Sequence, residues 1–395
     1  MKSFVSRALA QFGPTIFTEM TALANQLGAI NLALGFPDFE GPEGVIEAAV
    51  AALRSGENQY SRSRGHPILV NAIAEHQRRF YNLEYDPQTE VMVFCGATEG
   101  IVSSMLGLLN PGDEVILFEP FYDSYPVCVS MAGAVPRFVP LRPPDFSIDL
   151  QELEAAFGER TRLLVLNTPH NPTGKVFSRG ELDSIARLCQ EHDVIVLTDE
   201  VYEHLTYGLA EHIPMATLPG MRERTLTVSS AGKVFSLTGW RVGWATGPAE
   251  LISAAQAAHQ YLTFCSTTPL QVAVGYALRA YTDDYLASLK REYTERRDFL
   301  MKALSDCGFR VTEPHGAFFV VADFSPIAEV EDRRFAREMV ERWKVAAVPM
   351  SVFYHEGSPV GSRLLRFAFC KRIETLRSAA ARLNGATAAA EQLNA

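Results

Sequence analysis

The sequence predicts an α/β protein with a large domain, in which helices cover both faces of a mostly parallel sheet, and a smaller α+β domain. Three observations lead to this prediction. The chain has 395 residues, and a single hydrophobic core stops growing at about 250–300 residues. From Glu90 to Gly247, short apolar runs alternate with stretches of helical periodicity. After Tyr281, charged helical patterns surround two strand-like runs instead.

Five apolar runs predict the strands of the large sheet. Each run is apolar at successive positions and rich in β-branched residues, which suits a strand that is buried on both faces. The runs are residues 91–94, 115–118, 163–166, 194–197 and 226–229. The segment 181–188, between two of these runs, has the helical pattern expected of a crossover connection between parallel strands.

The rest of the chain completes the predicted organisation. The small domain is predicted from two helical patterns and two strand-like runs, at 284–305, 333–343, 317–321 and 364–369. The first 40 residues show no strong alternation of strands and helices, and we expect them to pack with the small domain. The predicted parts are an N-terminal segment, a large domain and a small domain, with boundaries 1–40, 41–282 and 283–395.

The composition is that of an ordinary globular protein, with 47% hydrophobic and 21% charged residues. It excludes a disordered chain, a coiled coil and a collagen-like rod. The formal net charge is −10, and because an acidic chain repels phosphate backbones we expect no nucleic-acid partner. No run approaches the roughly 18 apolar residues that a membrane span needs, so we expect no membrane association.

Six cysteines lie far apart, and none forms a C-x-x-C pair. The sequence therefore predicts neither a zinc knuckle nor a redox dithiol, and we expect no metal. A reducing compartment is the simpler interpretation of these scattered cysteines. Because the first residues also lack the apolar core of a signal peptide, we expect a cytoplasmic protein.

The residues that follow each apolar run are the candidates for a functional site, because open α/β sheets bind ligands beyond the carboxyl ends of their strands. After 91–94 comes the turn CGATEG, which includes Ala97 and Thr98 and opens a helical stretch. Backbone N–H groups there would meet the positive end of a helix dipole, which suits a phosphate. A plain turn between a strand and a helix is the alternative.

Two further strand ends carry polar side chains. After 163–166 comes NTPHNPTGK, in which two prolines and a glycine fix a rigid loop and bring the amide of Asn171 to the sheet edge. After 194–197 come Asp199 and Tyr202. A carboxylate that ends a buried strand is costly unless a cationic group meets it. The alternative is that Asp199 caps the turn that follows.

The run 226–229 leads to Lys233 and Arg241, which lie among small and apolar residues. A lysine amine in water has a pKa of about 10.4 and is a poor nucleophile. Desolvation and nearby cations lower that pKa and prepare the amine for a Schiff base. Arg241 adds a planar guanidinium suited to phosphate. The alternative is a surface lysine in a loop, which the flanking Ser, Gly and aromatic residues disfavour.

One ligand satisfies all four strand ends. It needs an aldehyde for Lys233, a basic ring nitrogen for Asp199, and a phosphate and a phenolic oxygen for the remaining polar groups. Pyridoxal 5′-phosphate has all of these, and a lysine Schiff base with an aspartate at the pyridinium nitrogen is characteristic of its sites. The sequence therefore predicts an enzyme that uses this cofactor.

With these residues, the chain resembles the class I pyridoxal-phosphate aminotransferases of fold type I, and among them the methionine and the kynurenine or glutamine aminotransferases. Three motifs occur in the family's order and spacing: Asn171-Pro172-x-Gly174, Asp199-x-x-Tyr202, and Ser230-x-x-Lys233 with Arg241. The resemblance extends from NLALGFPDF at 31–39 to RFAF at 366–369. It implies that the mostly parallel sheet of the large, cofactor-binding domain has seven strands.

The resemblance also implies a role for each cofactor-binding residue. Lys233 would form the Schiff base and move a proton, and Asp199 would keep the ring nitrogen protonated. Tyr202 and Asn171 would hydrogen-bond the ring oxygen, while Tyr122 would stack on the ring. The implied phosphate ligands are the backbone of Ala97 and Thr98, the side chains of Ser230 and Arg241, and Tyr60 of the neighbouring subunit. That last contact implies a homodimer with shared active sites.

For the substrate, the resemblance implies that Arg366 binds the α-carboxylate with its charged guanidinium, beside Gly35 and Asn171. The alternative is that Arg366 is an edge-strand residue that faces water. The implied side-chain pocket is formed by Phe17, Phe353 and, from the neighbouring subunit, Phe264. Such an apolar lining suits methionine or an aromatic amino acid.

The expected activity is transfer of an amino group from an apolar or aromatic L-amino acid to a 2-oxo acid, with a methionine-like donor or Phe, Tyr, Gln or kynurenine. A cysteine-conjugate β-lyase with the same cofactor stays open, because both reactions begin with removal of the α-proton. A non-catalytic sensor of this fold would need an additional basic DNA-binding unit, whereas about 30 residues precede Asn31 and the chain is acidic. Fold alone does not decide activity, but the set of site residues favours an enzyme.

Overall fold

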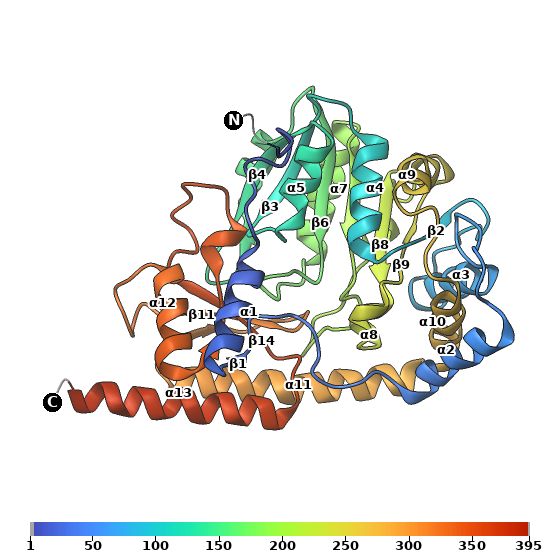
Figure 1. Ribbon diagram of the computed structural model, residues 1–395. Coiled ribbons are helices and arrows are strands. Elements are labelled where there is room, and N and C mark those ends of the chain that lie inside the picture. Colours follow the sequence, from blue (N-terminus) through green and yellow to red (C-terminus); the bar gives the residue numbers. More distant parts are fainter. Residues whose placement is uncertain (1–3, 394–395) are drawn as a thin grey trace.

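The computed structural model describes the backbone of residues 4–393 and the side chains of residues 4–384. Its largest feature is an eight-stranded sheet (Figure 1). In spatial order the strands are β2 (Val91–Phe94), β9 (Gly243–Thr246), β8 (Thr225–Ser230), β7 (Ile195–Asp199), β6 (Thr161–Asn167), β3 (Glu114–Glu119), β4 (Val135–Arg142) and β5 (Ser147–Ile148). The five predicted apolar runs correspond to β2, β3, β6, β7 and β8.

The sheet is mostly parallel, as predicted, but it has eight strands instead of seven. The strands β8, β7, β6, β3 and β4 pair in parallel, whereas β9 is antiparallel to both of its neighbours. The additional strand is β5, whose two residues pair antiparallel with Leu141 and Arg142 at the end of β4. The chain turns back between them at Phe146, which has a positive φ of 55°. So short a return strand has no apolar run by which the sequence could reveal it.

Alternate residues of the central strands point to opposite faces of the sheet, so each face has its own core. Leu163 and Val165 of β6 belong to one core, and Leu164 and Leu166 belong to the other. The first face is covered by α4 (Ala97–Leu108), α5 (Ser124–Met131) and α9 (Ala249–Leu262), and the second by α3 (Pro67–Tyr81), α7 (Arg179–Glu191) and α10 (Thr268–Ala280). Burial on both faces explains why these strands are apolar at successive positions.

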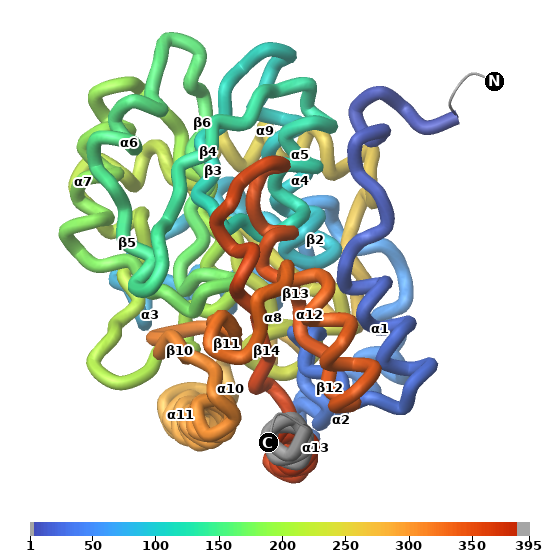
Figure 2. The backbone as a smooth tube through the Cα atoms, turned by 90° about the vertical axis from the view of Figure 1, so that its left-hand side faces the viewer, coloured from blue at the N-terminus to red at the C-terminus, as the bar shows by residue number. Residues whose placement is uncertain are grey.

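The C-terminal part forms a second, antiparallel sheet. Its order is β10 (Arg310–Thr312), β11 (Phe319–Asp323), β14 (Leu364–Ala368) and β13 (Val348–Pro349). Near the N-terminus, β1 (Ile30–Asn31) pairs in parallel with β12 (Val345–Ala346), and α1 (Ile16–Leu27) packs beside β12 (Figure 2). The N-terminal segment therefore contacts the C-terminal part of the chain, while the three proposed domain boundaries stay predictions.

The remaining helices surround these two sheets. The long helices α11 (Asp283–Asp306) and α13 (Ile373–Leu393) lie side by side along one side of the molecule (Figures 1 and 2). The predicted helix at 333–343 is α12 (Asp332–Glu338), continued by a π-helical turn at Met339–Trp343. The shorter helices are α2 (Glu43–Ser55), α6 (Leu150–Ala155) and α8 (Ala231–Val234), with 3₁₀ turns at Met215–Thr217, Thr238–Trp240 and Met350–Phe353. Within the described residues, none of the helices combines the length and apolarity needed to cross a membrane.

The register of the large sheet brings the ends of four strands to one edge. Asn167, the last residue of β6, pairs with Asp199, the last residue of β7. Ser230 at the end of β8 pairs with Gly243 of β9, which also pairs with Phe94 at the end of β2. The polar residues at and after these strand ends therefore meet at one edge of the sheet, as the sequence predicted.

Candidate active site

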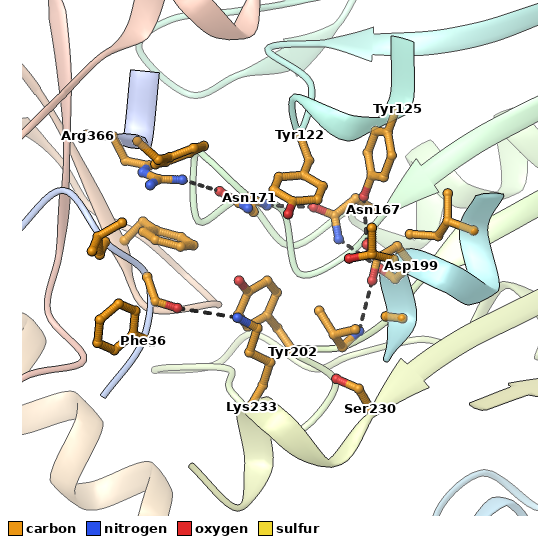
Figure 3. Close-up of a pocket in the computed structure, with 18 of the residues that line it drawn as sticks. Phe36, Tyr122, Tyr125, Asn167, Asn171, Asp199, Tyr202, Ser230, Lys233 and Arg366 are labelled. Atoms are coloured by element: carbon orange, nitrogen blue, oxygen red, sulfur yellow. Dashed lines mark hydrogen bonds between the residues drawn. The ribbon is translucent and has the colours of Figure 1, made fainter. Parts of the chain in front are cut away.

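A cavity of about 250 Å³ lies at this edge of the sheet. Its walls come from the strand ends of the large sheet, from β11 and β14 of the small sheet, and from the N-terminal segment. The predicted site residues that line it are Phe17, Gly35, Ala97, Thr98, Tyr122, Asn171, Asp199, Tyr202, Ser230, Lys233, Arg241 and Arg366. Figure 3 shows Arg366 and Asp199 at opposite ends of the group, with Lys233 between them.

Asp199 is buried at the end of β7. The hydroxyl of Tyr125 donates a 2.7 Å hydrogen bond to its Oδ2, and the backbone N–H of Val201 donates to its Oδ1 at 3.3 Å. Burial raises the pKa of this carboxyl from 3.8 to about 6, although the two hydrogen bonds and the nearby Lys233 act in the opposite direction. Such a carboxylate is held in place but forms no ion pair with a described lysine or arginine, so a protonated ring nitrogen would be a suitable partner.

Lys233 lies on the short helix α8, directly after β8. Its Nζ donates a long hydrogen bond of 3.4 Å to the carbonyl oxygen of Gly35 and lies 5.6 Å from the ring centre of Tyr202. Burial lowers the pKa of the amine from 10.5 to about 8. A larger share of the amine is therefore unprotonated near neutral pH than in a solvent-exposed lysine, which a nucleophile or a general base requires.

The N-terminus of α4 and Arg241 form a cradle at one side of the cavity. Gly96, the N-cap of α4, has a φ of 81° and provides no side-chain cap for the helix. The backbone conformation at Gly96 requires glycine, and a Cβ there would also displace the guanidinium of Arg241. With the hydroxyls of Thr98 and Ser230 beside them, these groups have the donors and the positive charge that a phosphate needs.

Arg366 is buried in β14 with 1% of its surface exposed. Its Nη1 donates to Oδ1 of Asn171 at 2.7 Å, and its Nη2 donates to the carbonyl oxygen of Ala33 at 2.9 Å. Its Nε is buried without a hydrogen-bond partner, and no described carboxylate forms an ion pair with it. Because β14 lies between β11 and β13, the alternative of an edge-strand arginine that faces water is wrong. A buried guanidinium with a free donor suits a carboxylate ligand.

Three of the predicted site residues do not line the cavity of this chain. Phe353 is fully buried, 6.1 Å from the ring of Phe17 and 5.1 Å from the guanidinium carbon of Arg366, so it packs behind the cavity wall. Tyr60 and Phe264 pack edge to face at 5.3 Å on the surface, where they are 82% and 46% exposed. Neither of these two aromatic side chains lines the cavity of its own chain.

The sequence interpretation missed several residues that line the cavity. They are Leu34, Phe36, Ile101, Tyr125, Asn167, Val201 and Phe319. Tyr125 could have been found, because it lies one helical turn after Tyr122 and the two rings are 5.6 Å apart. Asn167 ends β6, and its Nδ2 donates to the carbonyl oxygen of Asp199 at 2.8 Å. The contact of Phe319 with the site depends on how the small sheet packs, which no local pattern reveals.

The residues that line the cavity suit the chemical groups of pyridoxal 5′-phosphate and of an amino acid. The cradle at Gly96 and Arg241 suits the phosphate, and Lys233 suits the aldehyde. The buried carboxylate of Asp199 suits a protonated ring nitrogen. The unpartnered Nε of Arg366 suits the carboxylate of a substrate.

Known proteins resemble this chain over nearly its whole length. A probable N-succinyldiaminopimelate aminotransferase, DapC, of Mycobacterium tuberculosis is 46% identical over 389 residues, which are 96% of this chain and 98% of the relative. The methionine aminotransferase of Escherichia coli is 39% identical over 375 residues, covering 95% and 96% of the two chains. Kynurenine–oxoglutarate transaminase 3 of Mus musculus is 41% identical over 391 residues, covering 92% and 86%.

A solved structure supports the same relationship. The N-succinyldiaminopimelate aminotransferase of Mycobacterium tuberculosis superposes with a TM-score of 0.94 at 46% identity and covers 96% of this chain and 99% of that structure. The family model for aminotransferase class I and II matches residues 28–383. The chain therefore belongs to the class I and II aminotransferases and has their fold type I architecture.

Proposed function

We propose that this aminotransferase uses pyridoxal 5′-phosphate, as its family does, to transfer the amino group of an apolar or aromatic L-amino acid to a 2-oxo acid. The observation that carries the proposal is that Lys233, Asp199 and Arg366 surround one cavity. Asp199 and Arg366 are buried, which is unusual for charged side chains, and Lys233 is partly buried. Lys233 suits an aldehyde, Asp199 suits a basic nitrogen and Arg366 suits a carboxylate.

When bound, the cofactor supplies an aldehyde that reacts with amines and a ring that withdraws electrons from the α-carbon. Arg366 would bind the α-carboxylate of the substrate by charge-assisted hydrogen bonds. The amine of Lys233 would accept the α-proton at Nζ and return it later. Asp199, oriented by Tyr125, would hold a proton on the ring nitrogen. Asn171 and Tyr202 would donate hydrogen bonds to the ring oxygen, and Tyr122 would cover the ring.

The apolar part of the cavity supports the proposed substrate class. It includes Phe17, Leu34, Phe36, Ile101 and Phe319. The cationic residues among those that line it are Lys233, Arg241 and Arg366, and each already has a proposed partner. No cation in the lining is then left for a second carboxylate on the substrate, which favours methionine or an aromatic amino acid.

A second candidate substrate is N-succinyldiaminopimelate. The 46% identity to the Mycobacterium tuberculosis relative favours it. This compound carries charged groups far from the reacting carbon, so it would require a cation beyond those that line the cavity of one chain. Such a group would have to come from the partner subunit.

We also propose a homodimer with shared active sites in the cytoplasm. Large apolar side chains are exposed at and near the segment that contains Phe264, and exposed patches of this kind mark protein interfaces. They are Tyr60, Tyr261, Leu262, Phe264 and Tyr276. In such a dimer Tyr60 and Phe264 would face the partner's site. Six scattered cysteines without a C-x-x-C pair suit a reducing compartment.

Replacement of Lys233 by alanine should abolish cofactor attachment and lower kcat at least about a hundredfold, because a positioned acid–base group contributes roughly 10²–10⁴-fold. Borohydride reduction followed by peptide mass spectrometry should find the cofactor on the peptide that contains Lys233 in the wild type only. Lys302→Ala, on a side chain that is 77% exposed, serves as the control. Turnover by Lys233→Ala at the wild-type rate would refute the proposal.

Replacement of Asp199 by asparagine should inactivate the enzyme and yet stabilise the cofactor-free protein above pH 6. Burial raises the pKa of Asp199 from 3.8 to about 6, so between these two pH values the folded protein holds a proton on Asp199. The unfolded chain does not, so this carboxyl lowers stability as the pH rises through that window. Across the whole window, the shift in the pKa of Asp199 lowers the free energy of unfolding by about 3 kcal/mol. Urea unfolding of the cofactor-free wild type and Asp199→Asn at pH 4 and pH 8 measures this effect. If the two proteins differ in free energy of unfolding by the same amount at both pH values, the prediction is wrong.

A substrate panel tests the proposed specificity. With 2-oxoglutarate as acceptor, we expect kcat/KM for methionine or phenylalanine to exceed that for N-succinyldiaminopimelate by at least about tenfold. The reverse order would favour the second candidate. Release of pyruvate and ammonia from a cysteine conjugate without any 2-oxo acid would identify β-lyase activity instead.

Sedimentation equilibrium of the purified protein should give the mass of two chains. Tyr60→Ser should leave the two-chain particle intact, because one interfacial side chain carries a small part of a large interface. The same variant should bind the cofactor less tightly, because it lacks the contact of Tyr60 with the cofactor's phosphate group. A single-chain mass for the active enzyme would contradict the shared site.

A further inference from the structure

A second cluster of titratable side chains lies outside the cavity described above. His76 of α3 and the adjacent residues Glu203 and His204, which follow β7, bring their potential ligand atoms within 4.8 Å of one another. Nε2 of His76 and Nε2 of His204 form a hydrogen bond of 2.8 Å. His76 and Glu203 are buried, and His204 is partly exposed. A separate small cavity of about 10 Å³ borders all three residues.

The charge of this cluster is not balanced by the surrounding protein. Within the described residues, Glu203 forms no ion pair with an arginine or a lysine. Its carboxylate accepts hydrogen bonds from the hydroxyls of Tyr81 and Ser229, each at 2.7 Å, which favour the ionised form. A buried carboxylate whose neighbours are two imidazoles, with no ion pair to a described lysine or arginine, is a site that a cation would stabilise.

The ligand types indicate which cation. Imidazole nitrogens suit zinc, copper, iron and nickel, whereas calcium and magnesium prefer oxygen ligands. Two imidazoles and one carboxylate are a known combination for zinc when water supplies the fourth ligand. A cavity of about 10 Å³ is close to the minimum that holds one water molecule. The partial exposure of His204 leaves a route by which an ion can enter.

The geometry is close to that of a tetrahedral centre. With zinc–nitrogen bonds of about 2.0–2.1 Å, two ligand nitrogens lie roughly 3.3 Å apart. The two Nε2 atoms share a hydrogen bond of 2.8 Å, so the ion would replace this hydrogen bond and the rings would separate by about half an ångström. A carboxylate has about four lone-pair positions, and the hydroxyls of Tyr81 and Ser229 use two. These hydroxyls orient the carboxylate as outer-shell hydrogen bonds do in metal sites.

We propose that His76, Glu203 and His204 form a binding site for one divalent transition-metal ion, with zinc as the expected occupant and water as the fourth ligand. The metal would connect α3 to the segment that carries Asp199 and Tyr202. Through the hydrogen bond from Ser229, the same carboxylate also reaches the end of β8. The ion would therefore stabilise the scaffold behind the active site and take no part in the reaction.

The test uses the holoenzyme after dialysis against a chelator and removal of that chelator. Zinc chloride is added, unbound metal is removed, and elemental analysis should find one zinc per chain. Cobalt(II) added in place of zinc should give the intense visible bands of a tetrahedral site, at longer wavelengths than the cofactor absorbs. Bound zinc should also raise the Tm of the wild type.

Variants assign the metal to this cluster. His76→Gln and His204→Gln should each lower zinc affinity at least about tenfold, the loss seen when even an outer-shell partner of a metal ligand is removed. Both variants should lose the zinc-dependent rise in Tm. His192→Gln, at an exposed histidine outside the cluster, should bind zinc as the wild type does. Circular dichroism and the cofactor's absorbance verify that each variant is folded.

Two results would overturn the proposal. One is a folded wild type that retains no zinc beyond a protein-free blank. The other is undiminished zinc binding by folded His204→Gln, whose partly exposed position makes it the variant most tolerant of substitution. If His76→Gln does not fold, His204→Gln and the cobalt spectrum of the wild type still decide the question.

Discussion

The position of β7 between β6 and β8 is the constraint on which the candidate active site depends. Asp199 ends β7 and pairs with Asn167 on one side and with Val228 on the other. This register places a carboxylate where water is excluded, and the hydroxyl of Tyr125 keeps it there. A shift of β7 by one residue would turn Asp199 to the other face of the sheet. The burial that raises the pKa of Asp199 is thus a consequence of strand pairing.

Three charged groups share this desolvated environment. Lys233 and Asp199 belong to the large sheet and its connections, whereas Arg366 belongs to the small sheet, so the cavity exists only when the two sheets pack together. Arg366 reaches Asn171 across that boundary at 2.7 Å. Charges that are costly to bury are tolerated where a ligand neutralises them. These charges therefore lower the stability of the protein without a ligand and raise its affinity for a ligand with complementary groups.

The segment from Asp199 to His204 contributes side chains both to the cavity and to polar contacts outside it. Asp199 and Tyr202 line the active-site cavity. Glu200 instead meets His212 at 2.8 Å, and Glu203 meets Tyr81 and Ser229. The polar contacts of Glu200 and Glu203 hold the segment in place, and with it the side chains that line the cavity. A rigid scaffold supports a catalytic residue in this way. A metal ion in the histidine–glutamate cluster would strengthen the same connection.

The sequence by itself determined the α/β class, five of the eight strands of the large sheet and the set of polar residues at their ends, because strand burial and turn chemistry are local properties. It also selected Lys233, Asp199 and Arg366, which the structure brings to one cavity. It did not reveal β4, β5 or β9, the hydrogen bond from Tyr125 to Asp199, or the proximity of His76 and His204, which are 128 positions apart. Nor did it distinguish Phe353, which packs behind the wall, from Phe17, which lines the cavity. Such contacts depend on how helices and sheets pack, and the same local pattern is compatible with many packings. Only the tertiary structure decides them.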